Sequence, residues 1–344
     1  MTMTKETPTT MRVWKYTSTD GGIEKTLQLH KSEPPPKPSP KEHLVQVLAV
    51  GLNPVDYKPA ESFAGRFMIK KPATPGFDIA GRILAPAQGS KLQRGDLIFG
   101  AASTNPLAGG ALAEYIAAPA ERVTALPRGV SPLQAAGAPV AAVTAHDSLV
   151  PYIQKGSRVF INGGSGGVGT YGIQIAKAIG ALVTVSCSAR NAELCRSLGA
   201  DEVFDYNASP LIDQLRAAKP FDHVVDNVFN DPKLYFQAHT YTTPAAKFAE
   251  VASGPSLAFI KFALQASLLP SFFGGGRRKC VLVLSDVKQH TLDKIGSWFV
   301  DGQVKTVIDQ TFTFEQVVDA YKRQKTGRAV GKVIVDVAGE GNAW

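Results

Sequence analysis

Residues 157–187, SRVFINGGSGGVGTYGIQIAKAIGALVTVSC, determine the fold of the chain, and they contain a complete G-x-G-x-x-G at 164–169. The apolar, β-branched run 158–162 before the glycines indicates a buried strand, and residues 172–179 after them have apolar side chains at helical spacing. A second strand-like run follows at 182–185. A strand, a glycine turn, a helix and a strand thus occur within roughly 30 residues, which is the βαβ context of a dinucleotide-binding unit.

The glycine turn itself indicates phosphate binding. Without Cβ atoms the backbone can approach a pyrophosphate, and the first free N–H groups of the helix meet its negative charge. A glycine-rich turn without a ligand would have the same local sequence, but the βαβ context favours the dinucleotide site.

The end of the second strand indicates which dinucleotide is bound. An NAD site usually has an acidic residue about 20 positions beyond the first glycine, whereas residues 185–191 read VSCSARN, with no acid and one arginine. A carboxylate would repel a 2′-phosphate, and small hydroxyls with a guanidinium would bind it. We therefore expect NADPH rather than NADH. The alternative is that Arg190 begins the next helix as a solvated residue.

The composition excludes several classes of protein. A chain of 344 residues with 44% hydrophobic residues can form two domains with a substantial core. The net charge is +8, and the sequence has no run of five or more like charges. Positive charge spread in this way suits an anionic cofactor and does not require a nucleic-acid partner. The three cysteines have no CxxC spacing and indicate neither a disulfide framework nor a Cys-rich zinc site. The polar N-terminal segment lacks a secretory signal, so we expect a cytoplasmic protein.

The character of the chain changes along its length. Short strand-like runs separated by Gly and Pro indicate a β-rich, barrel-like first domain. Strands and helices then alternate, as in a parallel-sheet domain, before the last part becomes strand-like again. We expect a first domain at 11–127 plus 301–344, a second domain at 128–300, and disorder in residues 1–10.

One apolar segment, LAFIKFALQASLLPSFF at 257–273, requires separate consideration. It is short for a bilayer span, carries Lys261 and is interrupted by Pro270. Because the basic cluster 277–279 follows, an interfacial helix is an alternative. We expect instead a mobile apolar cap over the cofactor crevice or a subunit contact, with any membrane association at most peripheral.

Five motifs support a resemblance to a known family. They are NPVD at 53–56, PGFDIAG at 75–81, GDLIFG at 95–100, the glycine turn at 163–169, and TGRAVGKVIV at 326–335. In this order they resemble the zinc-free quinone reductase and enoyl reductase branch of the medium-chain dehydrogenase/reductase superfamily, including the chloroplast-envelope quinone oxidoreductase type and fungal trans-acting enoyl reductases. The resemblance covers nearly the whole chain. It implies an α/β protein in which a GroES-like β-barrel catalytic domain is split around a Rossmann domain with a doubly wound parallel sheet.

The zinc ligands of other superfamily members are missing from this chain. Zinc-dependent members place a Cys at the 53–56 turn, a His-Glu pair near Phe77 and Asp78, and four cysteines in a lobe that corresponds to roughly 90–115, where this chain has none. Zinc requires such N and S ligands. We therefore expect no metal.

The resemblance implies a reductase that transfers hydride to an activated C=C bond, in an α,β-unsaturated carbonyl, or to a quinone. Without a metal, hydrogen-bond donors must stabilise the charge that develops on the carbonyl oxygen. The resemblance indicates Lys58 and Tyr57 as candidate donors and Thr144 beside the nicotinamide. Each has a structural alternative: an exposed loop lysine, a core tyrosine, and a helix threonine that bonds its own backbone.

The resemblance also assigns cofactor-binding positions. Ser165, Gly166, Gly167 and Val168 are expected at the pyrophosphate, Ser188, Arg190 and Tyr206 near the 2′-phosphate and adenine, and Val330 and Gly331 in the C-terminal segment that closes on the cofactor. Asn53 and Asp56 are expected to contribute from the 53–56 turn.

Two other functions remain open at this point. One is a trans-acting enoyl reductase of a polyketide-type pathway, which would require a synthase partner. The other is a non-catalytic NADPH-binding or membrane-associated protein. The expected substrates are small enones, enoyl thioesters or quinones, and a homodimer is common for this fold.

Overall fold

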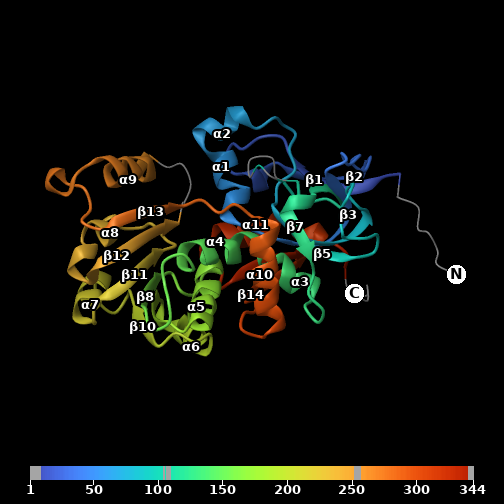
Figure 1. Cartoon of the computed structure of the whole chain (residues 1–344). Helices are drawn as coiled ribbons and strands as arrows, with labels where there is room; N and C mark the ends of the chain where they lie inside the picture. Colours follow the sequence, from blue (N-terminus) through green and yellow to red (C-terminus); the bar gives the residue numbers. More distant parts are fainter. Residues whose placement is uncertain (1–8, 104, 106–109, 252–256, 340–344) are drawn as a thin grey trace. The chain divides into compact units, whose positions relative to one another are not determined.

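The computed structural model describes residues 9–103, 105, 110–251 and 257–339. Two compact units divide the chain (Figure 1). The first unit comprises Met1–Val140, Val287–Val300 and Ile308–Trp344, and the second comprises Ala141–Asp286 and Asp301–Val307. Of the N-terminal segment 1–10 that we expected to be disordered, residues 1–8 lie outside the described residues.

Helix α10 (Gln289–Val300) groups with the first unit, whereas we placed all of 128–300 in the second domain. The reason lies in its contacts with strand β7 (Val123–Ala125). Thr124 Oγ1 donates a hydrogen bond to Asp293, and an Arg122 guanidinium nitrogen donates to the Val287 carbonyl at 2.8 Å. Long-range contacts of this kind are not visible in the local alternation of strands and helices.

The first unit is built on a seven-stranded sheet. Its order is β14 (Ile308–Thr313), β15 (Lys332–Asp336), β3 (Glu42–Gly51), β4 (Asp78–Ala85), β5 (Leu97–Ala101) and β7, with β6 (Tyr115–Pro119) also on β3. A separate two-stranded sheet joins β1 (Met11–Tyr16) to β2 (Leu27–Glu33). Antiparallel pairing of β15 with β3 joins the last part of the chain to the sheet of the first unit.

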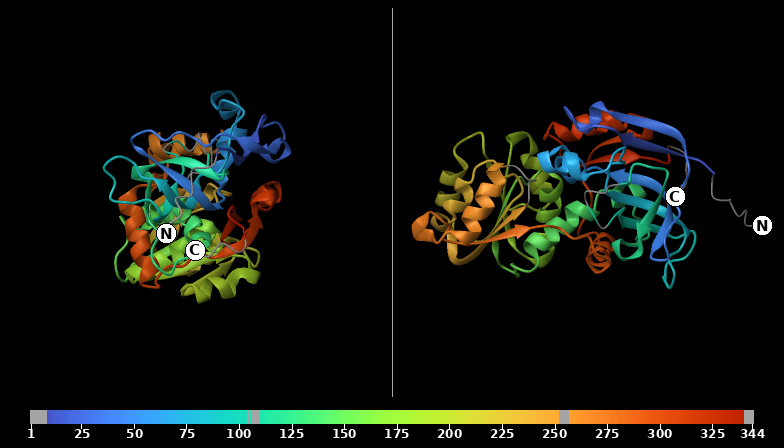
Figure 2. Two further views of the ribbon diagram at one scale, coloured as in Figure 1. Left: turned by 90° about the vertical axis from the view of Figure 1, so that its right-hand side faces the viewer. Right: turned by 90° about the horizontal axis from the view of Figure 1, so that it is seen from above.

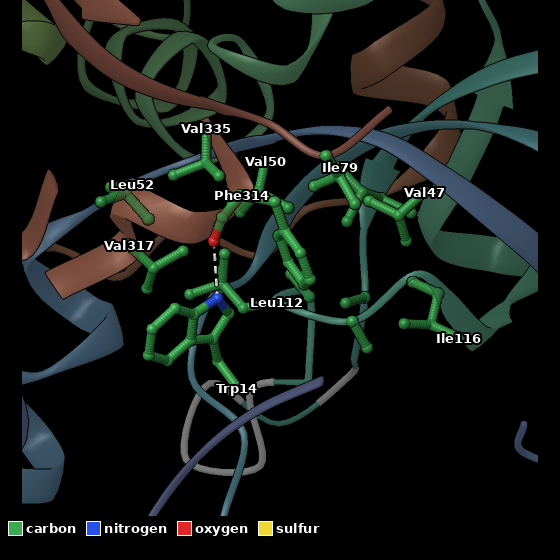
Figure 3. Close-up of a cluster of buried hydrophobic side chains, with 14 of the residues drawn as sticks. Trp14, Val47, Val50, Leu52, Ile79, Leu112, Ile116, Phe314, Val317 and Val335 are labelled. Atoms are coloured by element: carbon green, nitrogen blue, oxygen red, sulfur yellow. Dashed lines mark hydrogen bonds between the residues drawn. The ribbon is translucent and has the colours of Figure 1, made fainter. Parts of the chain in front are cut away.

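The core of the first unit combines side chains of this sheet with side chains of β1 and of the segment that contains Phe314 and Val317 (Figure 3). Side chains of the central strands, such as Val47, Val50 and Ile79, are almost fully buried because β3 and β4 have neighbours on both sides. Trp14 is buried with its indole N–H donating to the Phe314 carbonyl at 2.7 Å, so its polar atom is satisfied inside the core.

The second unit contains a six-stranded, fully parallel sheet. Its order is β10 (Glu202–Asp205), β9 (Leu182–Cys187), β8 (Arg158–Asn162), β11 (Phe221–Asp226), β12 (Thr242–Val251) and β13 (Lys279–Val283). The strand order reverses beside β8, because the chain first moves out to β10 and then returns to β11 on the other side. In such sheets the ligand crevice lies at the carboxyl ends of the strands, at this reversal. The expected alternation of strands and helices is therefore confirmed.

Helices cover both faces of this sheet (Figures 1 and 2). One hydrophobic cluster includes Ile173 of helix α5 (Gly167–Ile179) and Cys195 of helix α6 (Ala192–Ser197). A second cluster on the other face includes Tyr235 of α8 (Lys233–Phe236) and Phe262 of α9 (Leu257–Leu268). Because both faces are covered, the central strands are nearly continuous apolar runs, as expected for a parallel sheet.

Candidate functional site

The glycine turn between β8 and α5 is held against the end of β9. The Gly163 N–H donates to Ser186 Oγ at 3.0 Å, and the Gly164 N–H donates to the Ser186 carbonyl at 2.8 Å. A Cβ on Gly164 would lie 2.7 Å from Val185, and one on Gly169 would lie 2.1 Å from the Gly163 carbonyl oxygen. These two glycines are therefore required by close packing of the turn itself.

Gly166 has a different role because it faces open space. A Cβ there would have only the Gly163 oxygen within 4 Å, at 3.5 Å. Gly166 is the N-cap of α5, and no side chain caps the helix. The amides of residues 167–169 therefore lack an acceptor one turn back, and they carry the positive end of the helix dipole. The expected positions Ser165, Gly166, Gly167 and Val168 thus lie at an open helix N-terminus, which we call the glycine cradle; a site of this kind favours anions.

The loop after β9 supplies the second part of this site. Ser188 Oγ is buried and has no hydrogen-bond partner among the described residues. Arg190 is exposed and forms no ion pair with another described residue. The register of β10 on β9 pairs Asp205 with Cys187, so Tyr206, which is 51% exposed, follows at the position next to Ser188. A hydrogen bond of 3.0 Å from Asn191 Nδ2 to Ser165 Oγ connects this loop to the glycine turn.

A polar row across the carboxyl ends of the strands was not foreseen from the sequence. Ser186 Oγ donates to Asn162 Oδ1, and Asn162 Nδ2 donates to Asp226 Oδ1 at 2.8 Å. Asp226 Oδ1 also accepts from the Val228 and Phe229 amides. Ser186, which stands where an NAD site has its acid, is therefore fully buried and supports the glycine turn. The sequence signal for this row is the polar residue at or near the end of each of the three strands β8, β9 and β11.

Glu250 continues this row on β12, where it pairs in register with Asp226. It is 1% exposed, and its Oε1 atom has no partner among the described residues. Burial, together with the nearby Asp226 carboxylate, raises the pKa of Glu250 to about 10. Burial therefore favours the protonated form of this carboxyl group.

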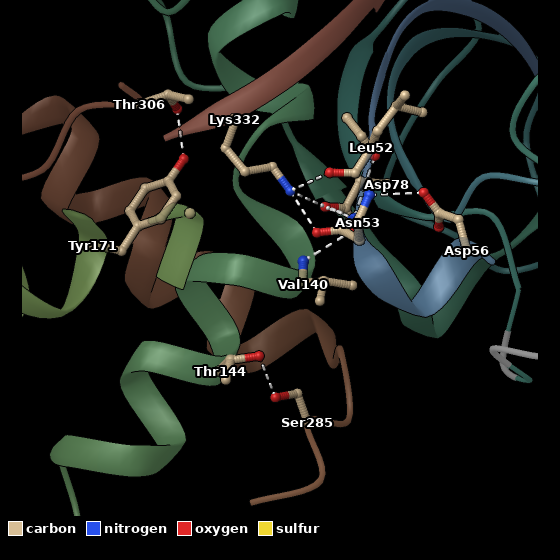
Figure 4. A network of polar contacts seen from close by, with 12 residues as sticks. Leu52, Asn53, Asp56, Asp78, Val140, Thr144, Tyr171, Ser285, Thr306 and Lys332 are labelled. Carbon is tan, nitrogen blue, oxygen red and sulfur yellow. Dashed lines mark hydrogen bonds and ion pairs between the residues drawn. The ribbon is translucent and has the colours of Figure 1, made fainter. Parts of the chain in front are cut away.

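Thr144 lies in helix α4 (Pro139–Leu149) and is 4% exposed (Figure 4). Its hydroxyl shares a hydrogen bond of 2.5 Å with the Ser285 hydroxyl, which follows β13. Two hydroxyls therefore lie together in the second unit. The sequence indicated Thr144 as a site residue but not Ser285.

A buried ammonium organises the 53–56 turn of the first unit (Figure 4). Lys332 Nζ donates to Asn53 Oδ1 at 2.5 Å and to the Leu52 carbonyl at 3.1 Å, and it lies 3.5 Å from Asp78 Oδ2. Asn53 Nδ2 donates to the same Asp78 oxygen at 2.8 Å, and the Val140 amide donates to its other oxygen at 3.0 Å. The Asn53 side chain is thus bonded at both ends within the unit.

Burial acts in opposite directions on the charges of this network. It raises the pKa of Asp78 to about 6 and also raises the pKa of Asp56, whereas it lowers the pKa of Lys332. The attraction between Lys332 and the carboxylates opposes all three shifts. Asp56 Oδ2 accepts from the Asn53 amide at 2.7 Å, and its Oδ1 has no partner among the described residues.

Tyr57 and Lys58 follow this turn in different environments. Tyr57 is 9% exposed and belongs to the core cluster, with its ring 6.5 Å from that of Tyr321 and the Lys325 ammonium 5.2 Å above it. Burial raises the pKa of its hydroxyl to about 12. Lys58 is exposed at the start of α1 (Lys58–Glu61), although partial desolvation lowers the pKa of its ammonium.

Val330 and Gly331 precede the network lysine directly. The Val330 amide donates to Asp309 Oδ1 at 2.9 Å, and Gly331 is buried with a φ of 82°, a conformation that favours glycine. The register of β15 on β3 then brings Lys332 opposite Asn53. The first unit thus brings together Asn53, Asp56, Val330 and Gly331, although their contacts with a cofactor remain a prediction.

The described part of the chain contains no group of three or more His, Cys, Asp or Glu side chains that could hold a metal ion. Where zinc-dependent relatives have Cys and His-Glu ligands, this chain has Asn53 and Asp78, with Lys332 as the neighbouring cation. The residues of the second unit, in contrast, fit a nicotinamide dinucleotide. The uncapped helix offers free amides, and Ser188 offers a buried hydroxyl without a partner.

A parallel sheet with a glycine turn and an open helix N-terminus is typical of dinucleotide-binding domains, among them those of nicotinamide-dependent oxidoreductases. Comparisons with known proteins support the same class of protein. Residues 39–128 match the alcohol dehydrogenase GroES-like domain, and residues 198–335 match the zinc-binding dehydrogenase family. The chain is 39% identical to the trans-enoyl reductase pgmF of Aspergillus terreus, over 97% of this chain and 98% of that protein.

Two further relatives belong to the quinone oxidoreductases. The chloroplast envelope quinone oxidoreductase homolog of Arabidopsis thaliana is 32% identical over 95% of this chain and 98% of its own length. The solved quinone oxidoreductase of Coxiella burnetii has a TM-score of 0.83 and 25% identity, over 95% of this chain and 99% of that one. The chain therefore belongs to the enoyl reductase and quinone oxidoreductase branch of the medium-chain dehydrogenase/reductase superfamily. It is an oxidoreductase with a GroES-like domain, a Rossmann-type parallel sheet and a nicotinamide cofactor.

Two glycine substitutions should separate packing of the turn from ligand binding. Gly169→Ala should lower the free energy of unfolding by about 1–3 kcal/mol, because its methyl group would collide with the Gly163 and Gly164 backbone. Gly166→Ala should leave stability within about 0.5 kcal/mol of the wild type, yet weaken dinucleotide binding on the order of tenfold or more, since its methyl group would fill the cradle. Urea unfolding and cofactor fluorescence titration measure the two effects. A loss of binding by Gly166→Ala that merely follows lost stability would contradict the assignment.

Removing the network ammonium should destabilise the first unit. Lys332→Met leaves Asp78 buried without its counter-charge, so we expect a loss of about 3–5 kcal/mol in the free energy of unfolding. The double variant Lys332→Met/Asp78→Asn should recover more than half of this loss, because it removes the uncompensated charge. Urea unfolding of the double variant and of both single variants, Lys332→Met and Asp78→Asn, measures the coupling. Strictly additive losses would show that the two groups act independently.

Proposed function

We propose that the protein is an NADPH-dependent, metal-free reductase of C=C bonds conjugated to a carbonyl, or of quinones. The observation that carries this proposal is the open, uncapped N-terminus of α5 next to the buried, partnerless Ser188 hydroxyl and the exposed Arg190 guanidinium. These groups supply amides for a pyrophosphate and a hydroxyl and a cation for a 2′-phosphate.

When bound, the reduced nicotinamide supplies the hydride. The residues of the chain hold and orient the cofactor. The amides of 167–169 bind the pyrophosphate, and Ser188 with Arg190 binds the 2′-phosphate beside Tyr206. The paired hydroxyls of Thr144 and Ser285 offer both a donor and an acceptor to a carboxamide.

For the proton, we assign the donor role to Lys58 and a supporting role to Tyr57. Lys58 reaches solvent, and the lowered pKa of its ammonium makes proton donation easier. Tyr57 is fixed between Tyr321 and Lys325, and its raised pKa disfavours the phenolate. The turn that precedes both residues is positioned by Asn53 and Asp56, which support the site through the Lys332 network.

The relatives support the substrate class. Their names describe a trans-enoyl reductase and quinone oxidoreductases, so enones, enoyl thioesters and quinones are the substrates to test. The trans-enoyl reductase relative favours a second candidate, a reductase that acts in trans on carrier-bound enoyl chains of a synthase. A homodimer is compatible with either function.

A panel assay tests the function directly. Loss of NADPH absorbance should occur with some enones, enals or quinones, or with enoyl thioesters either free or carrier-bound. Activity only on carrier-bound chains would favour the trans-acting function. If NADPH binds but every member of the panel fails, the catalytic proposal is wrong and a non-catalytic NADPH-binding protein remains.

Cofactor choice can be tested at Arg190. Arg190→Ala should weaken NADPH binding by roughly tenfold or more, because one charge-assisted contact to the 2′-phosphate is lost, and should leave NADH binding nearly unchanged. Fluorescence titration with both cofactors measures this difference. Equal weakening of both would refute the 2′-phosphate assignment.

The two donor candidates can be separated by a matched pair of variants. Lys58→Met should lower kcat about a hundredfold while NADPH affinity stays the same, since it removes a donor to the developing charge. Tyr57→Phe keeps the packed ring and should lower kcat by less than about threefold, a loss too small for such a donor. The reverse order of effects would assign the donor to Tyr57.

A further inference from the structure

Helix α9 has apolar side chains on its buried side and also on its exposed side. Toward the sheet, Phe262 is 2% exposed and packs against Phe229 at a ring distance of 5.0 Å. Away from the sheet, Leu257, Ile260, Leu264 and Leu268 are 86%, 45%, 55% and 71% exposed. Their spacing of three or four residues makes them one continuous stripe, which we call the α9 ridge. A continuous apolar stripe exposed on a helix marks a surface for an apolar partner, so the ridge indicates a missing apolar environment.

The sequence on either side of the ridge carries only positive charge. No Asp or Glu occurs between Glu250 and Asp286, whereas this stretch contains Lys261, Arg277, Arg278 and Lys279. Lys261, Arg277 and Lys279 are exposed and form no ion pair with any residue that the structure describes. Arg278 instead forms a hydrogen bond within the protein, since its Nε donates to Thr242 Oγ1 at 3.0 Å.

We propose that the α9 ridge and its basic flank dock the protein reversibly on an anionic lipid surface. An apolar helical face bordered by Lys and Arg is the arrangement that lies in the headgroup region of a membrane, with the cations on the phosphates. A second copy of the chain is disfavoured as the occupant, since it would bring an equally basic, acid-free segment against this one. No helix among the residues described is long and apolar enough to cross a membrane, so the contact is peripheral.

The ridge belongs to the second unit, where α9 lies close to β13 (Figure 1). It takes no part in the glycine cradle or in the Ser188 loop. Docking therefore does not depend on the proposed reaction, and a failure of one leaves the other intact.

Vesicle co-sedimentation of the full-length protein tests the proposal. Binding should occur to phosphatidylcholine vesicles that contain roughly 30% phosphatidylserine, should be at least about fivefold weaker on pure phosphatidylcholine, and should be released at about 0.5 M salt. Leu264→Ser/Leu268→Ser should reduce the bound fraction at least about fivefold. Leu182→Ser/Phe63→Ser changes two other exposed apolar side chains and should bind like the wild type.

The charge contribution has its own matched control. Arg277→Gln/Lys279→Gln should weaken binding to the anionic vesicles severalfold, whereas Lys37→Gln/Lys41→Gln, which removes two exposed cations from the first unit, should not. Thermal unfolding confirms that each variant is folded.

Three outcomes would overturn the proposal. The first is no binding of the wild-type protein to anionic vesicles. The second is an equal loss in the Arg277→Gln/Lys279→Gln and Lys37→Gln/Lys41→Gln variants, which would attribute binding to the overall charge of +8. The third is concentration-dependent self-association in the absence of vesicles that Leu264→Ser/Leu268→Ser abolishes, because the ridge would then be an interface between copies.

Discussion

The first unit depends on one buried positive charge. Lys332 comes from the last strand of the chain, yet it bonds residues at the end of β3 and pairs with an aspartate at the start of β4. Burying an ammonium and a carboxylate is costly unless hydrogen bonds satisfy the remaining atoms. Asn53, Leu52 and the Val140 amide provide these bonds. The geometry of the 53–56 turn, and with it the direction in which the chain enters Tyr57 and Lys58, follows from this requirement.

A second polar network, which contains no lysine or arginine, acts in the second unit. Ser186, Asn162 and Asp226 connect the ends of three neighbouring strands by hydrogen bonds, and the same serine holds two amides of the glycine turn. A polar residue at the end of a parallel strand is therefore not automatically a ligand for the cofactor. Ser188, two residues beyond Ser186, is the hydroxyl that remains without a partner among the described residues. The absence of an acid after β9 thus has two consequences: Ser186 can be buried as a neutral group, and the following loop has no negative charge of its own.

Local sequence patterns predicted the fold well because they depend on near neighbours. The βαβ unit at 157–187, the alternation in the second unit and the return of the chain to the first sheet are all present. What could not be predicted are pairings between residues far apart in the chain. Lys332 lies 279 positions from Asn53, and Ser285 lies 141 positions from Thr144. The grouping of α10 with the first unit depends on similarly distant contacts, such as that of Asp293 with Thr124.

The same limitation applies to α9. Its sequence is strongly hydrophobic, but the sequence does not show which side of the helix is buried. An apolar run predicts that some face of the helix is buried. Only the structure shows that the side with Phe262 packs in the core while the α9 ridge stays exposed. The cost of keeping such a ridge in water requires a compensating contact. The acceptors proposed for this enzyme are conjugated carbonyls and quinones, which become more soluble in lipid as their chains lengthen. NADPH, in contrast, carries several negative charges and stays in water. A reductase docked by a basic, apolar helix would therefore meet both reactants at the boundary where each is concentrated.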